Sequence, residues 1–250
     1  MNHYLALTCE ALARSIYAVA ATAPHAISVR LVRQGLHNSP KTLRATLQEQ
    51  IDAVAPGAFD AILLAYGLCG TSTLGLAACH TPLVLPRAHD CITLYLGGRE
   101  RYQAEFEAHP GTYWYSLDYL ERSGNGASVG LGAATIGAMD EIYAEYVRKY
   151  GQDNADYLME VMGEWGRHYD RAVYIDMGTG DGQVYERMAQ DEAARRGWKF
   201  ERRQGDLRLL RKLVCGEWTP DEFLVVPPGW RIRQSSGDDL VDVEPVDTEL

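Results

Sequence analysis

The chain has 250 residues, of which 46% are apolar and 23% charged, an ordinary globular composition that supports one large core or two smaller domains. Its 24 lysines and arginines are outnumbered by 34 aspartates and glutamates, and the formal net charge of −10 argues against a nucleic-acid-binding protein. No segment approaches the ~20 consecutive apolar residues that a membrane-spanning helix needs, so we expect neither nucleic acid nor membrane among the partners.

The first hundred residues alternate predicted strands with predicted helices. Apolar and β-branched runs predict strands over residues 3–9, 26–32, 59–67 and 81–91. Helical spacing and good helix formers predict helices over residues 10–23, 39–55 and 74–80. The second of these helices begins with Ser39 as its N-cap and Pro40 at its first position. This alternation predicts a mostly parallel sheet that is covered on both faces.

The second half returns to the same order after an aromatic-rich stretch. Residues 109–170 carry aromatic and methionine side chains at helical spacing, which predicts a helical connecting segment. Beyond it the pattern predicts strands over residues 171–178, 198–206 and 222–229, with helices over 183–197 and 207–217. We therefore predict an α/β protein of two Rossmann-like lobes with mostly parallel sheets. Its expected parts are an N-terminal lobe (1–108), the connecting segment (109–170), a C-terminal lobe (171–235) and a poorly ordered acidic tail (236–250).

Five cysteines are distributed along the chain. The N-terminal segment lacks the basic start of a secretory signal and is interrupted by Glu10 and Arg14, so we expect a cytoplasmic protein with reduced thiols. Each cysteine is then either a small buried apolar residue or part of a chemical site. Cys79, in a predicted helix, and Cys215, near a helix end, are expected to be structural.

The other three cysteines follow predicted strands. Cys9 ends the first strand, while Cys69 and Cys91 come after the third and fourth. Because parallel strands have their carboxyl ends at one edge of a sheet, we expect these thiols to converge, with His89 beside them. Thiolates with a nearby imidazole suit zinc or an iron–sulfur cluster. The alternative is that each thiol is inert, because free cysteine is commonly buried in protein cores.

Either metal group would leave a place for a small-molecule substrate. Zinc with three protein ligands keeps an open position, and a cluster with three cysteines has one iron available. Gly67 and Gly70, on either side of Cys69, would let the backbone approach a bound group. Arg87 and Arg99 flank the last of the three cysteines, where they would hold a substrate carboxylate or phosphate, or else pair with a surface acid.

Six segments carry a family resemblance: LTCEALAR, YGLCG, PRAHDCITLYLGGRERY, PGTYW, YIDMG and FLVVPPG. They resemble the DUF1638 family of bacteria and methanogenic archaea. Because members are often encoded near corrinoid-dependent methyltransferases, the resemblance implies one-carbon metabolism as the context. It also implies a metal or cofactor site at Cys9, Cys69, His89 and Cys91. Some relatives place the histidine directly beside the cysteine, whereas Asp90 separates them here, so whether His89 is a ligand or an outer group stays open.

A glycine-rich turn follows the strand predicted at residues 171–178. The segment YIDMGTGDG, with Asp176, Gly178 and Gly180, resembles the first motif of S-adenosylmethionine-dependent methyltransferases, in which glycines let the backbone approach the cofactor. The alternative is a tight turn or one wall of a shared ligand crevice. Too little chain follows this turn to complete the usual methyltransferase fold.

These patterns leave the function open among three classes. The first is a zinc or iron–sulfur protein that carries out methyl or thiol-group transfer linked to corrinoid and one-carbon metabolism, with a corrinoid protein as partner. The second is a non-catalytic accessory protein that binds a corrinoid or a small metabolite between the two lobes. The third is an S-adenosylmethionine-binding methyltransferase.

Overall fold

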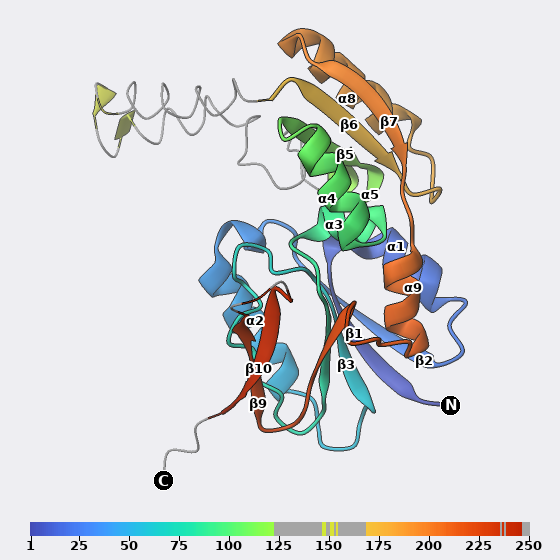
Figure 1. The fold of residues 1–250 in the computed structure, drawn as a ribbon, viewed down its shortest axis with the longest axis vertical. Coiled ribbons are helices and arrows are strands. Elements are labelled where there is room, and N and C mark those ends of the chain that lie inside the picture. Colours follow the sequence, from blue (N-terminus) through green and yellow to red (C-terminus); the bar gives the residue numbers. More distant parts are fainter. Residues whose placement is uncertain are drawn as a thin grey trace.

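The computed structural model describes residues 1–122, 147–148, 151–152, 154, 169–235, 237 and 239–246. Within these ranges the chain forms a mixed α/β fold with mostly parallel sheets, consistent with the predicted Rossmann-like class. Figure 1 shows a lower part built around β1 and β3 and an upper part built around β5, β6 and β7. Among the described residues, no helix is long and apolar enough to cross a membrane.

The larger sheet contains five strands in the order β2-β1-β3-β4-β8. Their bounds are β1 (His3–Cys9), β2 (Ala26–Val32), β3 (Ala61–Ala65), β4 (Leu83–Pro86) and β8 (Phe223–Val226). The first four are mutually parallel, as predicted, but β8 runs antiparallel to β4. The predicted C-terminal lobe therefore does not stay together, because its last strand returns to complete the N-terminal sheet.

Helices cover both faces of this sheet. The helical elements are η1 (Glu10–Leu12), α1 (Ala13–Ala20), η2 (Leu36–Asn38), α2 (Pro40–Asp52) and α9 (Arg208–Cys215). Alternate residues of β1 face opposite cores: Tyr4 and Ala6 pack with α1 and α9, whereas Leu5 and Leu7 pack with α2. Ser39 precedes α2 as predicted, but its hydroxyl bonds the Thr42 hydroxyl at 2.8 Å instead of capping the backbone.

The smaller sheet is parallel and has the order β5-β6-β7. Its strands are β5 (Thr112–Ser116), β6 (Arg171–Asp176) and β7 (Lys199–Gln204), and it is covered on one face by α8 (Gln183–Arg196). Its other face carries Trp114, Val173 and Ile175 into the core shared with α1 and α9. The aromatic residues predicted to begin a helical connection thus form a buried strand, and the rest of that predicted connection lies largely outside the described residues.

Two further predictions are corrected by the structure. The predicted acidic tail contributes β10 (Val241–Pro245), which pairs antiparallel with β9 (Trp230–Gln234). Ile232 and Val241 from this hairpin are buried in the α2-side core. Residues 74–80 form turns and a bridge between Ala77 and Arg231 instead of the predicted helix, and Cys79 is exposed there.

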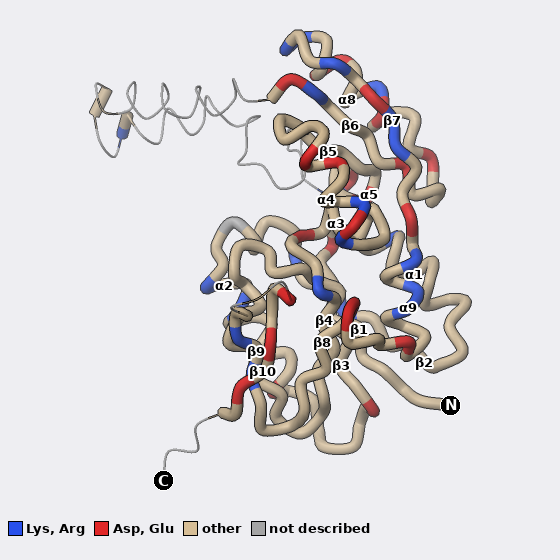
Figure 2. The backbone as a smooth tube through the Cα atoms, in the orientation of Figure 1, with Lys and Arg blue, Asp and Glu red and all other residues tan. Residues whose placement is uncertain are grey.

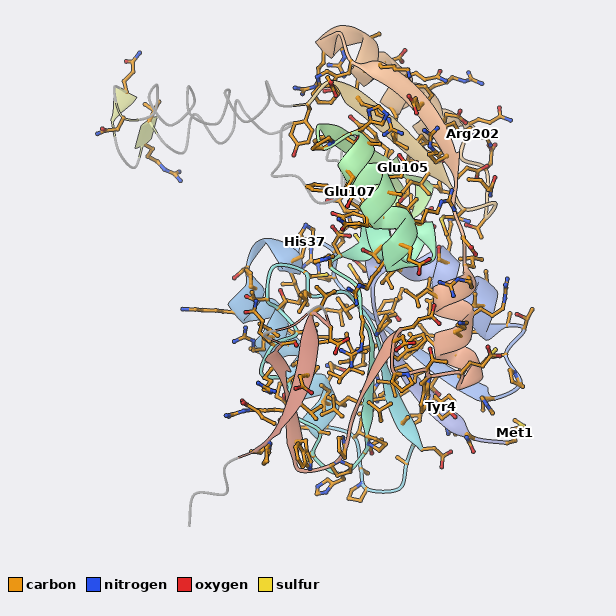
Figure 3. The ribbon with its side chains drawn as sticks, in the orientation of Figure 1. Met1, Tyr4, His37, Glu105, Glu107 and Arg202 are labelled. Atoms are coloured by element: carbon orange, nitrogen blue, oxygen red, sulfur yellow. The ribbon has the colours of Figure 1, made fainter. Side chains whose placement is uncertain are left out.

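A buried arginine fixes α4 (Arg99–Ala108) against the smaller sheet. Arg171, only 2% exposed, bonds Glu105 of α4 at 2.8 Å and Glu201 of β7 at 2.9 Å. Glu105 is labelled on α4 in Figure 3. Arg203 of β7 also bonds Glu105, at 2.9 Å. Along β7 one acidic residue, Glu201, stands among three basic ones (Figure 2), and Glu201 together with Glu105 compensates the charge that Arg171 buries.

The two sheets are joined where α1 meets α5 (Leu117–Arg122). The backbone N–H and the hydroxyl of Ser15 both donate to Asp118 Oδ2 at 3.1 Å. Arg14 pairs with Glu121 at 2.8 Å at the edge of the same contact. The Asp118 side chain is 1% exposed, and its second oxygen has no hydrogen-bond partner among the described residues. A buried carboxyl group is therefore built into the junction of the two sheets.

This carboxyl group makes stability depend on pH. Burial raises the pKa of Asp118 from 3.8 to about 6, so the folded state holds a proton that the unfolded chain releases. Its contribution to the free energy of unfolding is full below about pH 4 and is lost as the pH rises through about 6, a change of roughly 3 kcal/mol. We expect Asp118→Asn to remove this part of the pH profile in urea unfolding.

The control is Asp52→Asn, which changes an exposed carboxyl group on α2. Its pH profile should parallel that of the wild type. If the Asp118→Asn profile also runs parallel to the wild type between about pH 4 and pH 6, the buried carboxyl group does not carry the predicted proton.

Candidate functional site

The strand order places a crevice at the carboxyl ends of β1 and β3. From β1 the chain moves outward to β2, then returns across β1 to β3 on its other side. Connections that leave neighbouring strands in opposite directions open a space between them, which is where open α/β sheets bind ligands. Cys9 is the last residue of β1, and Cys69 lies in the segment that follows β3. Two of the predicted site residues therefore flank the switch point of the larger sheet.

Backbone hydrogen bonds bring the third cysteine to the same place. The N–H of Leu68 donates to the Ala88 carbonyl at 2.9 Å, and the N–H of Cys69 donates to the His89 carbonyl at 3.0 Å. The segment after β3 and the segment after β4 thus run side by side beyond the ends of their strands. Because of this pairing, Cys69 and Cys91 arrive together although 22 positions separate them in the sequence.

A glycine makes this close approach possible. A Cβ atom at Gly67 would lie 2.6 Å from the backbone nitrogen of Asp90, a distance that real Cβ atoms do not adopt. Asp90 in turn caps α3 (Cys91–Leu96) by accepting the Thr93 N–H at 3.2 Å, which makes Cys91 the first residue of that helix. The Tyr102 hydroxyl reaches the other carboxylate oxygen of Asp90 at 3.4 Å.

The three thiols are close enough to affect one another electrostatically. Burial is the main cause that raises the pKa of Cys9 to about 11 and that of Cys69 to about 12, and it raises the pKa of Cys91 well above its usual range. Cys9 contributes to the rise at Cys69, and both contribute to the rise at Cys91. The three thiols therefore lie in the same region of the fold, and their role as metal ligands stays a prediction.

The donor chemistry of this cluster fits a thiophilic metal. Burial makes the deprotonated form of each of the three thiols unfavourable in the absence of a metal. Zinc and iron–sulfur clusters bind cysteine sulfur in this deprotonated form and stabilise it. Within the described ranges, no three His, Cys, Asp or Glu side chains already stand in ligand positions around one point. Binding would therefore require the thiol side chains to turn toward the ion.

Backbone strain is concentrated at the middle cysteine. Cys69 has φ +45° and Thr71 has φ +78°, both in the left-handed region that non-glycine residues rarely occupy. Gly70 between them has φ +63°, where glycine carries no such penalty. The Ser72 hydroxyl holds the turn by donating to the Cys69 carbonyl at 2.7 Å. Strained residues of this kind cost about 1–3 kcal/mol each and cluster at functional sites.

A tyrosine that sequence reasoning did not assign adjoins the thiols. Tyr66 follows β3 directly and is 2% exposed, and its hydroxyl has no hydrogen-bond partner among the described residues. After burial, the charges of Cys9 and Cys69 are the largest causes that raise its pKa, which shows that the phenol lies near both sulfurs. In the sequence this residue could be noticed as a tyrosine, with its polar hydroxyl group, at the end of a strand that is otherwise wholly apolar.

The guanidinium group of Arg87 donates its hydrogen bonds to backbone carbonyls. Its Nε donates to the Pro220 carbonyl at 2.7 Å, and one terminal nitrogen donates to the carbonyls of Asp239 and Val241. These bonds tie the segment before β8 and the start of β10 to the end of β4. These contacts give Arg87 a structural role, and its role in holding a substrate group stays a prediction.

The glycine-rich turn after β6 has its own packing explanation. Asp176 accepts the Gly178 N–H at 2.9 Å and pairs with Arg202 at 2.5 Å. Gly180 has φ +71°, and a Cβ atom there would lie 2.6 Å from a terminal nitrogen of Arg14 on α1. These contacts connect the turn to β7 and α1, and the positive φ of Gly178 and Gly180 accounts for these two glycines as parts of a tight turn.

Removing the unpartnered Tyr66 hydroxyl should stabilise the metal-free protein. A buried hydroxyl without a partner carries a desolvation cost, so we expect Tyr66→Phe to raise the free energy of unfolding by about 1 kcal/mol in chemical denaturation. The matched control is Tyr4→Phe, because the Tyr4 hydroxyl accepts a hydrogen bond from Asn2 at 2.7 Å and its loss should lower stability. An equal loss in both variants would mean that the Tyr66 hydroxyl is bonded within the fold.

Comparison with known proteins agrees with the resemblance of the motifs. The model of a family described as "Protein of unknown function (DUF1638)" matches residues 31–214, well over half of the chain. The matched range includes Cys69, His89 and Cys91, whereas Cys9 precedes it. Neither the curated proteins nor the solved structures gave a match. The chain belongs to the DUF1638 family.

Proposed function

We propose that this protein binds zinc or an iron–sulfur cluster through Cys9, Cys69 and Cys91. The observation that carries the proposal is the convergence of three thiols from the ends of β1, β3 and β4 at the switch point of the larger sheet. Cysteines that served only as core residues would not need a left-handed backbone at Cys69 or a glycine contact beside it.

With three thiolate ligands, either metal group would supply an open coordination position, at which a substrate thiol is held as a nucleophilic thiolate or a substrate atom binds iron. The protein contributes the surroundings. Apolar residues of both cores pack against Cys9 and keep the sulfurs partly shielded from water. The raised pKa of Tyr66 keeps its phenol protonated, so that it serves as a hydrogen-bond donor to a ligand in the crevice.

The reaction class that we propose is methyl or thiol-group transfer in corrinoid-linked one-carbon metabolism, with a corrinoid protein as partner. This part of the proposal is supported by the family resemblance of the cysteine-bearing segments. The second candidate is a non-catalytic protein that binds a small metabolite. It is favoured by a cavity of about 840 Å³ whose wall includes His89, next to the proposed metal ligands.

Metal analysis of anaerobically purified protein tests the proposal. We expect about one zinc ion or one cluster per wild-type chain by elemental analysis, because three thiolates in one crevice bind such groups tightly. An iron–sulfur cluster would absorb broadly in the visible range, whereas zinc would be silent. Substitution of Cys9, Cys69 or Cys91 by serine should remove most of the bound metal.

The matched controls are Cys79→Ser, at an exposed position, and Cys215→Ser, at the end of α9. Both should retain the wild-type metal content. A wild-type protein without stoichiometric zinc or iron, or equal metal loss in the control variants, would rule out the three-thiol site. Chelation of the bound metal should also lower the melting temperature of the wild type but not that of Cys69→Ser.

A further inference from the structure

A large cavity opens beyond the carboxyl end of β4, with Arg87 and His89 in its wall. It has a volume of about 840 Å³ and lies between the α3–α4 junction, the start of α9 and the segment that precedes β8. Gly97 makes room for its wall, because a Cβ atom there would lie 2.7 Å from the Cβ atom of Asp206, in the segment that leads into α9. The cavity is therefore formed by close approach of α9 to the end of α3, and it is of a size that accommodates a small metabolite.

The wall of this cavity is basic although the chain as a whole is acidic. Five basic and four acidic residues line it, in a chain with a formal net charge of −10. Figure 2 shows basic residues along α9, at one side of this space. The basic lining residues are Arg87, Arg99, Arg101, Arg208 and Lys212. Such a local excess of positive charge attracts anions.

One carboxylate already occupies part of the basic wall. Glu222 accepts hydrogen bonds from Arg208 at 2.5 Å and from Lys212. A single negative charge thus faces two positive ones, and these contacts lower the pKa of Glu222 against the opposing effect of burial. The geometry shows that an oxyanion is accommodated between these two cations, since the protein's own carboxylate is held there.

Two other guanidinium groups in the wall bond only neutral atoms among the described residues. Arg101 donates to the Gln204 carbonyl at 2.6 Å, and the bonds of Arg87 all go to backbone carbonyls. A carbonyl oxygen uses an N–H donor without cancelling the charge, and a guanidinium has five such donors. Arg101 therefore keeps donors and positive charge for a further partner, and Arg87 keeps N–H donors while its charge also helps to lower the pKa of Asp242.

We propose that this cavity binds a small molecule bearing an oxyanion, a phosphate or a carboxylate, through Arg87 and Arg101 with Arg208 and Lys212. Binding of the anion does not require a metal in the thiol site. A further consequence does rest on the proposed function: because His89 belongs to the cavity wall and Cys91 follows two positions later, the bound molecule would have its other end at the metal. The anion would then anchor the substrate of the thiol centre.

Calorimetric titration of the full-length protein at low ionic strength tests this proposal, with inorganic phosphate and succinate as separate probes. We expect at least one probe to bind, with an affinity that falls as salt is added. Preference for phosphate would identify a phosphorylated ligand, and preference for succinate a carboxylated one. Arg101→Gln should weaken binding roughly tenfold, because it removes a charge-assisted hydrogen-bond donor.

Two further variants distinguish a direct effect on anion binding from a general effect of the substitution on the fold. Glu222→Gln should strengthen binding several-fold, because the internal carboxylate that competes for Arg208 and Lys212 is neutralised. Arg211→Gln, an exposed position on α9 outside the cavity lining, should leave the affinity unchanged. Weaker binding in Glu222→Gln, or an equal loss in Arg211→Gln and Arg101→Gln, would overturn the proposal.

This experiment distinguishes failure of the cavity proposal from failure of the thiol-site proposal. Cys69→Ser removes a proposed metal ligand but no group of the cavity wall, so anion binding should persist in that variant. Loss of binding in Cys69→Ser would place the anion on the metal and overturn the cavity proposal. Absence of heat and of any shift in melting temperature with both probes would overturn it as well, whatever the metal content of the protein.

Discussion

The contact on which the site depends is the one between Gly67 and the backbone of Asp90. Because glycine lacks a Cβ atom, the segment after β3 runs directly against the segment after β4. Two backbone hydrogen bonds, donated by Leu68 and Cys69, continue the pairing of β3 with β4 past the ends of these strands. Any larger residue at position 67 would push these segments apart, because its Cβ atom would lie 2.6 Å from the Asp90 nitrogen. Cys69 would then move away from Cys91, and the turn that holds Cys69 in its left-handed conformation would lose its support.

Several features at this edge of the sheet oppose the stability of the fold. The thiols are held where ionisation is unfavourable, the Tyr66 hydroxyl is buried without a partner among the described residues, and Cys69 has a backbone conformation that glycine would adopt more easily. Elsewhere, as in the alternation of Tyr4 and Leu5 between two cores, local preference agrees with the global fold. The buried Asp118 carboxyl group is a second conflict, at the junction of the sheets, and a concentration of such conflicts around one group of residues is typical of functional sites.

The sequence predicted the local elements well and the long-range ones poorly. The strand ending at Cys9 and the spacing of Leu43, Leu47 and Ile51 on α2 are confirmed because the apolar period alone determines them. The pairing of β8 with β4 was not predictable, since hydrophobic pattern does not reveal which sheet a strand joins. The strand β10 was missed because its net acidic composition concealed the alternation of Val241 and Val243 with outward carboxylates. The strand ends predicted that the three thiols would lie in one region, whereas the burial of the Tyr66 hydroxyl without a partner among the described residues is revealed only by the fold.

Three consecutive residues after β4 face three different environments, and this arrangement bears on the role of the histidine. His89 lines the basic cavity, Asp90 caps α3 and contacts Tyr102, and Cys91 lies with the other thiols. An imidazole directly adjacent to the cysteine would have a different orientation, because Asp90 is the residue that turns the chain into the helix. With Asp90 between them, the imidazole belongs to the substrate side of the proposed centre and the thiols to the metal side. The same two-residue step would let one loop serve both the proposed metal site and the proposed anion cavity.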